Sequence, residues 1–482
     1  MNLHEYSSFD AIGLAELIRK GEVSPQELSR VAAEAIAAVN PRLNAVNEVY
    51  EDRIETPCDG DVPDGPLAGA PMLNKDLSFA EAGRRQEMGS VFTKGYVSAA
   101  NSTTVDRLKA AGINIVGRTT TPEFGNSGLT DSVISGTTRN PWDTDRTCGG
   151  SSGGSAAMVA AGAVPFATAS DGGGSTRTPA SLCGLIGLKP TRGLVPVGPG
   201  RGEGGGGLVG PFAVTRTIRD SALLLDIMAG PASGDPYEVR PLAVSASDAI
   251  RRDPPKLRIA FTEENWSGVQ TSDACRQGVR LAMEQLSDAG HHIEEAAPVF
   301  DWDAFFGDTV TIMCGNLATG IDGLSTVIGH APKEHELQSS TWACYRHGKS
   351  LSAVDFQKAL GGFNTVCRAF GRFFETYDVL ATPTTINPAP LLADSYSSNP
   401  SDPVDAAGYQ RNVYSNDHFV CMANTTGQPS LTLPVHQSGD GLPIGVQFLG
   451  RFSSEDTLFQ IGRYLEQAMP WRDRRPGVHV AS

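Results

Sequence analysis

The segment between residues 147 and 190 contains two glycine–serine turns, GGSSGGS at residues 149–155 and DGGGSTR at residues 171–177. A flexible linker would be polar and repetitive. Here the first turn is followed by AAMVAA at residues 156–161, which is small and apolar and fits a tightly packed helix. The glycines therefore mark turns inside a folded core, and this arrangement is typical of a catalytic site.

Helix and strand patterns alternate on both sides of this segment. Ser24 can cap a helix predicted over residues 25–39. Ser102 begins another helix, which Gly112 ends before a strand at residues 113–116. The same patterns predict helices over residues 218–228 and 455–468 and around 279–286, and strands at residues 257–261, 431–433 and 444–449. This alternation indicates an α/β fold, and we expect a single domain spanning residues 1–482.

Composition and charge exclude several classes of protein. The chain has 39 Lys and Arg residues against 54 Asp and Glu residues, a net charge of −15, with no basic run, so a nucleic-acid partner is not expected. No apolar run approaches the roughly 18 residues of a membrane helix. The N-terminus lacks the pattern of a secretory signal, which predicts a cytoplasmic protein. The eight cysteines are dispersed without a C-x-x-C pair, which argues against a disulfide framework or a zinc site.

Two short motifs allow other interpretations. The glycine-rich segment 198–207, expected to form a mobile surface loop or a lid, contains a G-x-G-x-x-G pattern, but this pattern follows no strand and opens no helix. Residues 150–154 match the nucleophile elbow of α/β-hydrolases, with Ser152 as the nucleophile of an esterase. That alternative needs a preceding apolar strand and a suitable histidine. Polar residues precede the elbow, and His418 and His436 lie in segments without a distinguishing pattern.

The two turns and the motifs around them carry a family resemblance. GGSSGGS, then DGGGSTRTPA at residues 171–180 and CGLIGLKPT at residues 183–191, are similar to the diagnostic stretch of the amidase signature family. GPLAGAP at residues 65–71 and LPIGVQ at residues 442–447 extend the resemblance over nearly the whole chain. The resemblance implies an amide hydrolase whose α/β fold has a large, mostly parallel mixed sheet covered by helices on both faces.

Carried over residue by residue, the family's triad falls on Ser175 as nucleophile, Ser151 as a bridging serine after a cis peptide bond, and Lys75 as base. A serine hydroxyl needs a base within hydrogen-bond reach. A lysine amine can be that base only when it is neutral, which requires burial away from carboxylates. We therefore expect Lys75 to be deeply buried with a lowered pKa, and Asp76 to point elsewhere. The scheme needs no metal and no cofactor.

The residues around the nucleophile fit the same scheme. Asp171 and Arg177 bracket the second turn, and we expect them to pair beneath it and fix its shape. Backbone N–H groups of residues without side chains can converge on a developing oxyanion. The residues expected to form the oxyanion hole are Gly172, Gly173 and Gly174.

Substrate contacts are expected from two other places. Gly125 and Asn126 lie in a segment that is near the scissile group in similar enzymes. The region around Cys314 resembles hydrolases of cyclic nylon oligomers such as the 6-aminohexanoate cyclic dimer, although Cys314 also fits a buried packing position. The resemblance therefore predicts a small-molecule carboxylic amide as substrate, whether a simple amide, an anilide, a urethane or a nylon-type oligomer. It is also compatible with a homodimer, and with the amidase subunit of a glutamine-dependent aminoacyl-tRNA amidotransferase.

Overall fold

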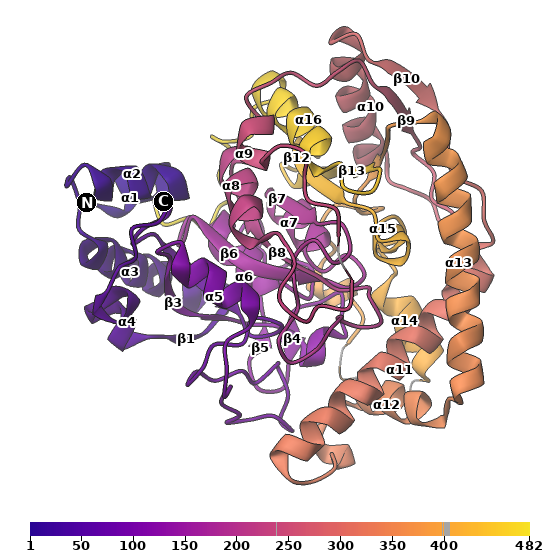
Figure 1. The fold of residues 1–482 in the computed structure, drawn as a ribbon, viewed down its shortest axis with the longest axis horizontal. Coiled ribbons are helices and arrows are strands. Elements are labelled where there is room, and N and C mark those ends of the chain that lie inside the picture. Colours follow the sequence, from indigo (N-terminus) through magenta and orange to yellow (C-terminus); the bar gives the residue numbers. More distant parts are fainter. Residues whose placement is uncertain (238, 398, 400–404) are drawn as a thin grey trace.

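The computed structural model describes residues 1–237, 239–397, 399 and 405–482 (Figure 1). Within these residues one sheet has eleven strands, in the order β1-β3-β2-β6-β8-β7-β12-β13-β11-β9-β10, and β4 and β5 form a separate small sheet. The strands are β1 (Val46–Val49), β2 (Pro71–Lys75), β3 (Asn114–Thr119), β4 (Asp131–Ser132), β5 (Gly136–Thr137), β6 (Phe166–Asp171), β7 (Ile186–Lys189), β8 (Gly210–Thr215), β9 (Arg258–Phe261), β10 (His292–Glu295), β11 (Val379–Pro383), β12 (Ser430–Gln437) and β13 (Pro443–Gly450).

The large sheet is mixed. β2 runs parallel to both its neighbours, β3 and β6, and β9 runs parallel to both of its own, β11 and β10. The other neighbouring pairs in the described part of this sheet are antiparallel. The predicted α/β class and large mixed sheet are confirmed. Parallel pairing is nevertheless confined to these two blocks, because pairs such as β12 and β13 are joined by a tight hairpin, which only antiparallel strands permit.

Helices cover both faces of the sheet. α8, α10 and α16 pack on one face, and α3 and α6 pack on the other (Figure 1). The helices are α1 (Leu3–Ser8), α2 (Ala11–Arg19), α3 (Pro25–Leu43), α4 (Glu51–Glu55), α5 (Thr103–Ala110), α6 (Gly153–Ala160), α7 (Arg177–Cys183), α8 (Ile218–Met228), α9 (Ala246–Ala249), α10 (Asp273–Asp288), α11 (Trp302–Ile328), α12 (Ser339–Ser350), α13 (Ala353–Thr376), α14 (Ala406–Val413), α15 (Cys421–Thr426) and α16 (Glu455–Ala468).

Two predicted helix starts are confirmed by their capping hydrogen bonds. The Ser24 hydroxyl accepts from the backbone N–H of Glu27 at 3.1 Å, and the Ser102 hydroxyl accepts from that of Val105 at 3.3 Å. α3 continues beyond its predicted end until Asn44, whose φ of 50° is left-handed and ends the helix. The sequence thus predicts the start of α3 more accurately than its end.

The parallel pair of β2 and β6 positions the polar residues of the core. Successive residues of a strand face opposite sides, so Met72 joins the hydrophobic cluster on one face of the sheet and Leu73 joins the cluster on the other. Both faces are therefore apolar. Because β2 and β6 are parallel neighbours, their carboxyl ends, at Lys75 and Asp171, lie at the same edge of the sheet.

Two long helices, α11 and α13, and the shorter α12 form a layer beside the sheet that the sequence did not predict (Figure 1, orange). Glycines inside α11 lower its intrinsic helix propensity. Glycine also permits the close approach of two of these helices. A Cβ added at Gly348 in α12 would lie 2.1 Å from the carbonyl oxygen of Cys314 in α11.

The glycine-rich segment 198–207 is packed in its second half. The carbonyl of Gly207 accepts a hydrogen bond from Arg192 Nε at 2.7 Å. The backbone at Gly206 faces α11, since a Cβ added there would lie 3.0 Å from Asn316 Nδ2. This half of the segment therefore packs against neighbouring parts of the chain, which differs from the free surface loop expected from its glycine content.

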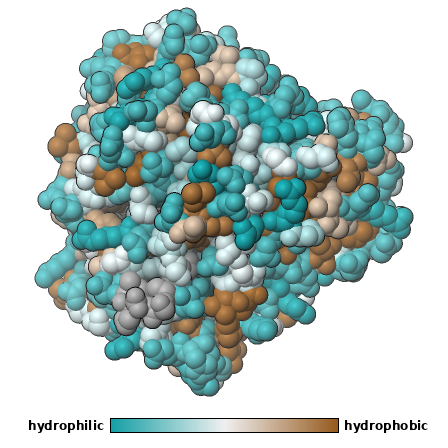
Figure 2. Space-filling model, turned by 180° about the vertical axis from the view of Figure 1, so that it is seen from behind, coloured by the Kyte–Doolittle hydropathy of each residue, from teal (hydrophilic) through white to brown (hydrophobic). Residues whose placement is uncertain are grey.

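Among the described residues, the face of the molecule opposite to that of Figure 1 carries no single large hydrophobic patch (Figure 2). Figure 2 shows a largely hydrophilic face on which hydrophobic residues occur in small, scattered groups. The described chain has no helix long and apolar enough to cross a bilayer. Buried polar residues that can carry chemistry, among them Lys75 and Asp171, lie at the edge of the sheet where β2 and β6 end.

Candidate active site

Lys75, the last residue of β2, points its amine into a cluster of serine hydroxyls. Its Nζ lies 2.8 Å from Ser151 Oγ, 2.9 Å from Ser152 Oγ and 3.1 Å from Ser170 Oγ. The side chain is buried, and in the described residues no carboxylate forms an ion pair with it. The amine is therefore in direct contact with the serine that the sequence placed beside it.

Burial lowers the pKa of Lys75 from its ordinary value of 10.5 to about 7, although the negative charge of Asp171 acts in the opposite direction. The adjacent carboxylate points away, as expected. Asp76 Oδ2 accepts from Arg118 at 2.8 Å, and Asp76 Oδ1 accepts from the backbone N–H of Glu87 at 2.9 Å. Near neutral pH, a substantial fraction of the Lys75 amine is thus uncharged and able to accept a proton.

The two glycine–serine turns meet beside this amine. The Gly150–Ser151 peptide bond is cis, as the family resemblance implied. The backbone N–H of Ser152 donates to the carbonyl of Ser175 at 3.2 Å, which ties the first turn to the second. Ser175 is half-buried and lines the same cavity as Ser151, and its hydroxyl makes no hydrogen bond within the described part of the chain. Its hydroxyl is therefore free to face a substrate.

Ser152 does not have the environment of a nucleophile. It is fully buried, and its hydroxyl contacts Lys75 and lies 3.4 Å from both the carbonyl and the amide nitrogen of Ser170. It occupies the N-cap position of α6 without capping the helix through its side chain. His418, a candidate base of the esterase alternative, packs against the ring of Trp302, with the two ring centroids 5.5 Å apart. These contacts disfavour the esterase alternative, and the hydroxyl orients the lysine amine rather than the helix end.

The three glycines before Ser175 divide into two groups. The backbone N–H of Gly174 donates to Asp171 Oδ1 at 2.7 Å, so it is already occupied, which corrects the expectation that it faces an oxyanion. Gly172 and Gly173 line the cavity, and their amides remain candidates for the oxyanion hole. A Cβ on Gly173 would lie 2.5 Å from the hydroxyl of Tyr414, so any larger residue there would require Tyr414 to move.

Asp171 and Arg177 pair beneath the turn, as predicted. Arg177 Nε donates to Asp171 Oδ2 at 2.9 Å and Arg177 Nη2 donates to Asp171 Oδ1 at 3.0 Å, and both side chains are completely buried. Arg177 also donates to the side chains of Asn424 at 2.7 Å and Gln447 at 3.0 Å. These contacts hold the pKa of Asp171 well below its usual range. The pair therefore anchors the nucleophile turn to the C-terminal part of the chain.

We expect Asp171→Asn to lower the free energy of unfolding by about 3–5 kcal/mol, because it leaves the buried guanidinium of Arg177 without its counter-charge. Urea unfolding followed by circular dichroism measures this change. Asp288→Asn, an exposed position at the end of α10, is the matched control and should change stability by less than about 0.5 kcal/mol. A loss below about 1 kcal/mol for Asp171→Asn would contradict the anchoring role.

The hydroxyls open into a cavity of about 130 Å³, which Gly125 and Asn126 also line. Gly125 has a φ of 70°, and a Cβ added there would lie 3.1 Å from Ser151 Oγ. Asn126 Oδ1 accepts from Gln410 Nε2 at 3.0 Å. Both residues therefore border the space beside the serine pair.

Cys314 does not line this cavity. It is fully buried in α11 and hydrogen-bonds with Cys344 of α12, which corrects its expected role as a substrate contact in favour of the packing alternative. Its neighbour Met313 lines the cavity instead. Two further lining residues, Tyr414 and Asp417, come from the C-terminal region, where no sequence motif marked them.

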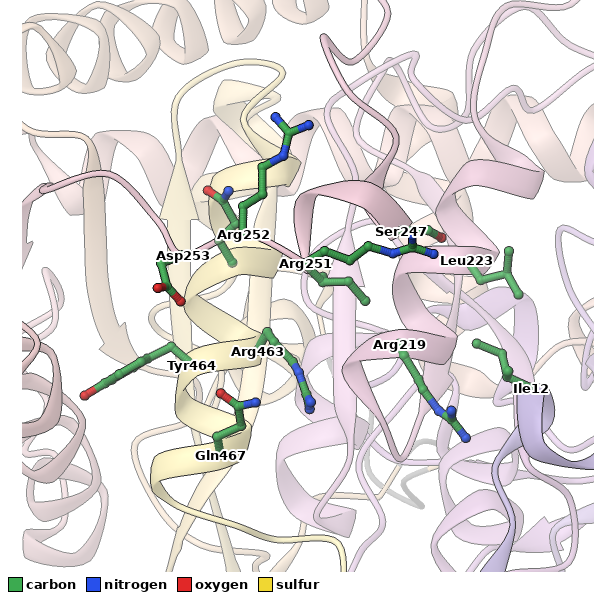
Figure 3. A pocket seen from close by; sticks show the side chains of 12 residues that line it. Ile12, Arg219, Leu223, Ser247, Arg251, Arg252, Asp253, Arg463, Tyr464 and Gln467 are labelled. Atoms are coloured by element: carbon green, nitrogen blue, oxygen red, sulfur yellow. The ribbon is translucent and has the colours of Figure 1, made fainter.

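A larger cavity of about 630 Å³ lies at the surface between α8, α9 and α16 (Figure 3). Several arginines line it, but their side chains point in different directions in Figure 3. Arg219 is paired with Asp10, with contacts of 2.5 Å, and Arg463 is paired with Glu466 at 2.7 Å. None of the catalytic candidates contributes to this cavity, so it is distinct from the serine–lysine site.

Known proteins resemble this chain over nearly its whole length. The family described as Amidase matches residues 27–459. A 6-aminohexanoate-cyclic-dimer hydrolase of Paenarthrobacter ureafaciens is 33% identical over 480 residues, which are 97% of this chain and 96% of that protein. An acylamidase of Rhodococcus erythropolis is 30% identical over 98% of both chains. The solved structure of a 6-aminohexanoate cyclic dimer hydrolase has a TM-score of 0.92 at 31% identity, covering 98% of this chain and 99% of that one. The chain therefore belongs to the amidase family and is an amide-hydrolysing enzyme.

Proposed function

We propose that this enzyme hydrolyses a small carboxylic amide through an acyl-enzyme on Ser175, with Lys75 as base and Ser151 as the bridging group. One observation carries the proposal. The buried amine of Lys75 lies 2.8 Å from Ser151 Oγ, and Ser151 shares a cavity with the half-buried Ser175. A base with a pKa near the working pH is suited to moving protons in both directions.

In the first half-reaction the neutral Lys75 amine takes the proton of Ser151, and Ser151 takes the proton of Ser175. Ser175 Oγ then bonds to the carbonyl carbon of the amide. The resulting oxyanion accepts hydrogen bonds from the amides of Gly172 and Gly173, and Asp171 holds the turn in place. When the C–N bond breaks, the leaving nitrogen receives a proton back through Ser151, which leaves the acyl group as an ester on Ser175.

In the second half-reaction a water molecule replaces the amine. The same relay removes a proton from the water, the hydroxide attacks the ester carbon, and Ser175 regains its proton as the carboxylic acid leaves. The substrate class rests on the relatives, whose names describe a cyclic amide hydrolase and an acylamidase. We therefore propose linear amides, anilides, urethanes and nylon-type oligomers as the compounds to test.

The test is a panel of these four compound classes incubated with the purified chain alone, with the released acid and amine quantified by mass spectrometry. We expect hydrolysis of at least one class without glutamine, ATP or a partner subunit. Failure on every class, combined with amide transfer once partner subunits and glutamine are supplied, would replace the proposal with the amidotransferase alternative. Hydrolysis by the isolated chain would exclude a requirement for such partners.

A further inference from the structure

We propose that Asp417 makes this enzyme selective for amides that carry an ammonium group near the scissile bond. The proposal rests on the proposed function of the same site and specifies its substrate. Asp417 comes from the turn between α14 and α15 and lines the cavity that contains Ser151 and Ser175. Within the described residues it is the only side chain lining that cavity that is ordinarily charged at neutral pH.

The carboxylate is held in place through one oxygen. Asp417 Oδ1 accepts from the hydroxyl of Thr178, in the first turn of α7, at 2.9 Å. The side chain is 5% exposed, and no lysine or arginine of the described chain forms an ion pair with it. Its other oxygen, Oδ2, lies toward Gly128, 3.6 Å from where a Cβ of that residue would be. A buried carboxylate without a cation partner is costly, and a bound ammonium would supply the missing partner.

A second cavity also borders Asp417. It has a volume of about 360 Å³ and shares Gly128, Val413 and Asp417 with the serine cavity, so Asp417 lies where the two spaces adjoin. Its lining includes a further carboxylate, Asp394, and in the described chain no lysine or arginine. Both spaces beside Asp417 are therefore bordered by carboxylate and by no cationic side chain of the described chain, which favours a positive charge.

Burial raises the pKa of Asp417 to about 7, an effect that Asp171 increases and Arg177 opposes. At about pH 8.5 the carboxylate is therefore ionised, while an alkylammonium group keeps its proton. Under these conditions the two charges can pair in a site from which water is largely excluded.

The test compares matched substrates at about pH 8.5. One pair varies the acyl part, an ω-aminoalkanoyl anilide against its isostere with a methyl group in place of the ammonium. The other pair varies the leaving amine, an ω-aminoalkyl amide against the same isostere. We expect the charged compound of one pair to have a kcat/KM about 10- to 100-fold higher than that of its isostere, and the preferred pair identifies the part of the substrate that reaches Asp417.

Asp417→Asn should remove this preference, which is measured as the ratio of the two kcat/KM values within each substrate pair, so that a general change in activity does not affect the readout. Asp288→Asn, which removes one exposed negative charge, should keep the preference intact. Turnover of the neutral isosteres without any preference in the unmodified enzyme would overturn this inference but leave the proposed function standing. An equal preference in Asp417→Asn would also overturn it.

A binding measurement does not depend on turnover. Calorimetry on the Ser175→Ala protein should detect a short ω-amino alkanamide binding about 10- to 100-fold more tightly than its methyl isostere. Equal affinities would contradict the role of Asp417 even if the variant Asp417→Asn failed to fold. If no amide were hydrolysed but the charged amide still bound preferentially, the proposed function would fail, whereas the binding of an ammonium group at Asp417 would be supported.

Discussion

Ser175→Ala is expected to reduce kcat for any amide substrate by roughly four to six orders of magnitude, because it removes the atom that forms the acyl-enzyme. The fold should not change, since Ser175 is half-buried and contacts the first turn through its backbone carbonyl rather than its hydroxyl. Initial rates by mass spectrometry and the melting temperature of the variant provide the two readouts.

The neighbouring hydroxyl provides the matched control. Ser152→Ala removes one contact with the lysine amine but no nucleophile, so its loss of activity should be much smaller than that of Ser175→Ala. If Ser152→Ala abolished turnover and Ser175→Ala retained it, the elbow alternative would be correct and the present assignment would be wrong.

Lys75→Met is expected to lower kcat/KM by about 10²–10⁴-fold, the usual contribution of a general base. The methionine fills the buried space without supplying a proton acceptor.

In the unmodified enzyme the active form of Lys75 is the neutral amine. Because burial lowers the pKa of Lys75 to about 7, the rate should rise about tenfold per pH unit below that value and level off above it. The residual activity of Lys75→Met should lack this rise.

Lys189→Met distinguishes the lysine of the site from another buried lysine. Burial also lowers the pKa of Lys189 to about 7, but its amine donates to the carbonyl of Pro190 at 2.6 Å and lies outside the serine cluster. The pH dependence of Lys189→Met should therefore keep the ionisation near pH 7. If Lys189→Met lost this ionisation while Lys75→Met retained it, the base would have been wrongly assigned.

Much of the site could be predicted because it is encoded locally. The two turns at residues 149–155 and 171–177 specify glycine and serine at fixed spacings, and Lys75 follows an apolar strand. Because burial disfavours the charged form of a lysine, the lowered pKa of Lys75 follows from its buried position beside serines and could be predicted with it. The Asp171–Arg177 pair is also local, because the two partners are only six positions apart in the sequence.

Features that depend on distant contacts could not be predicted. Tyr414 and Asp417 reach the cavity only because the turn after α14 folds back onto α7, and no short motif records that contact. The long helix α11 was missed because its glycines lower helix propensity, whereas packing against α12 and α13 determines its conformation. The backbone N–H of Gly174 does not belong to the oxyanion hole that the sequence predicts, because it donates to Asp171 Oδ1. That hydrogen bond depends on the shape of the turn, which the sequence alone does not reveal.

The most direct test of the central claim is the site of the acyl group during turnover. The enzyme is mixed with a good anilide or ester substrate, quenched in acid and digested, and the peptides are sequenced by mass spectrometry. We expect the acyl mass on Ser175 in the unmodified enzyme, and no adduct in Ser175→Ala. An acyl group on Ser151 or Ser152, or full turnover with no adduct detected at any serine under single-turnover conditions, would contradict the account.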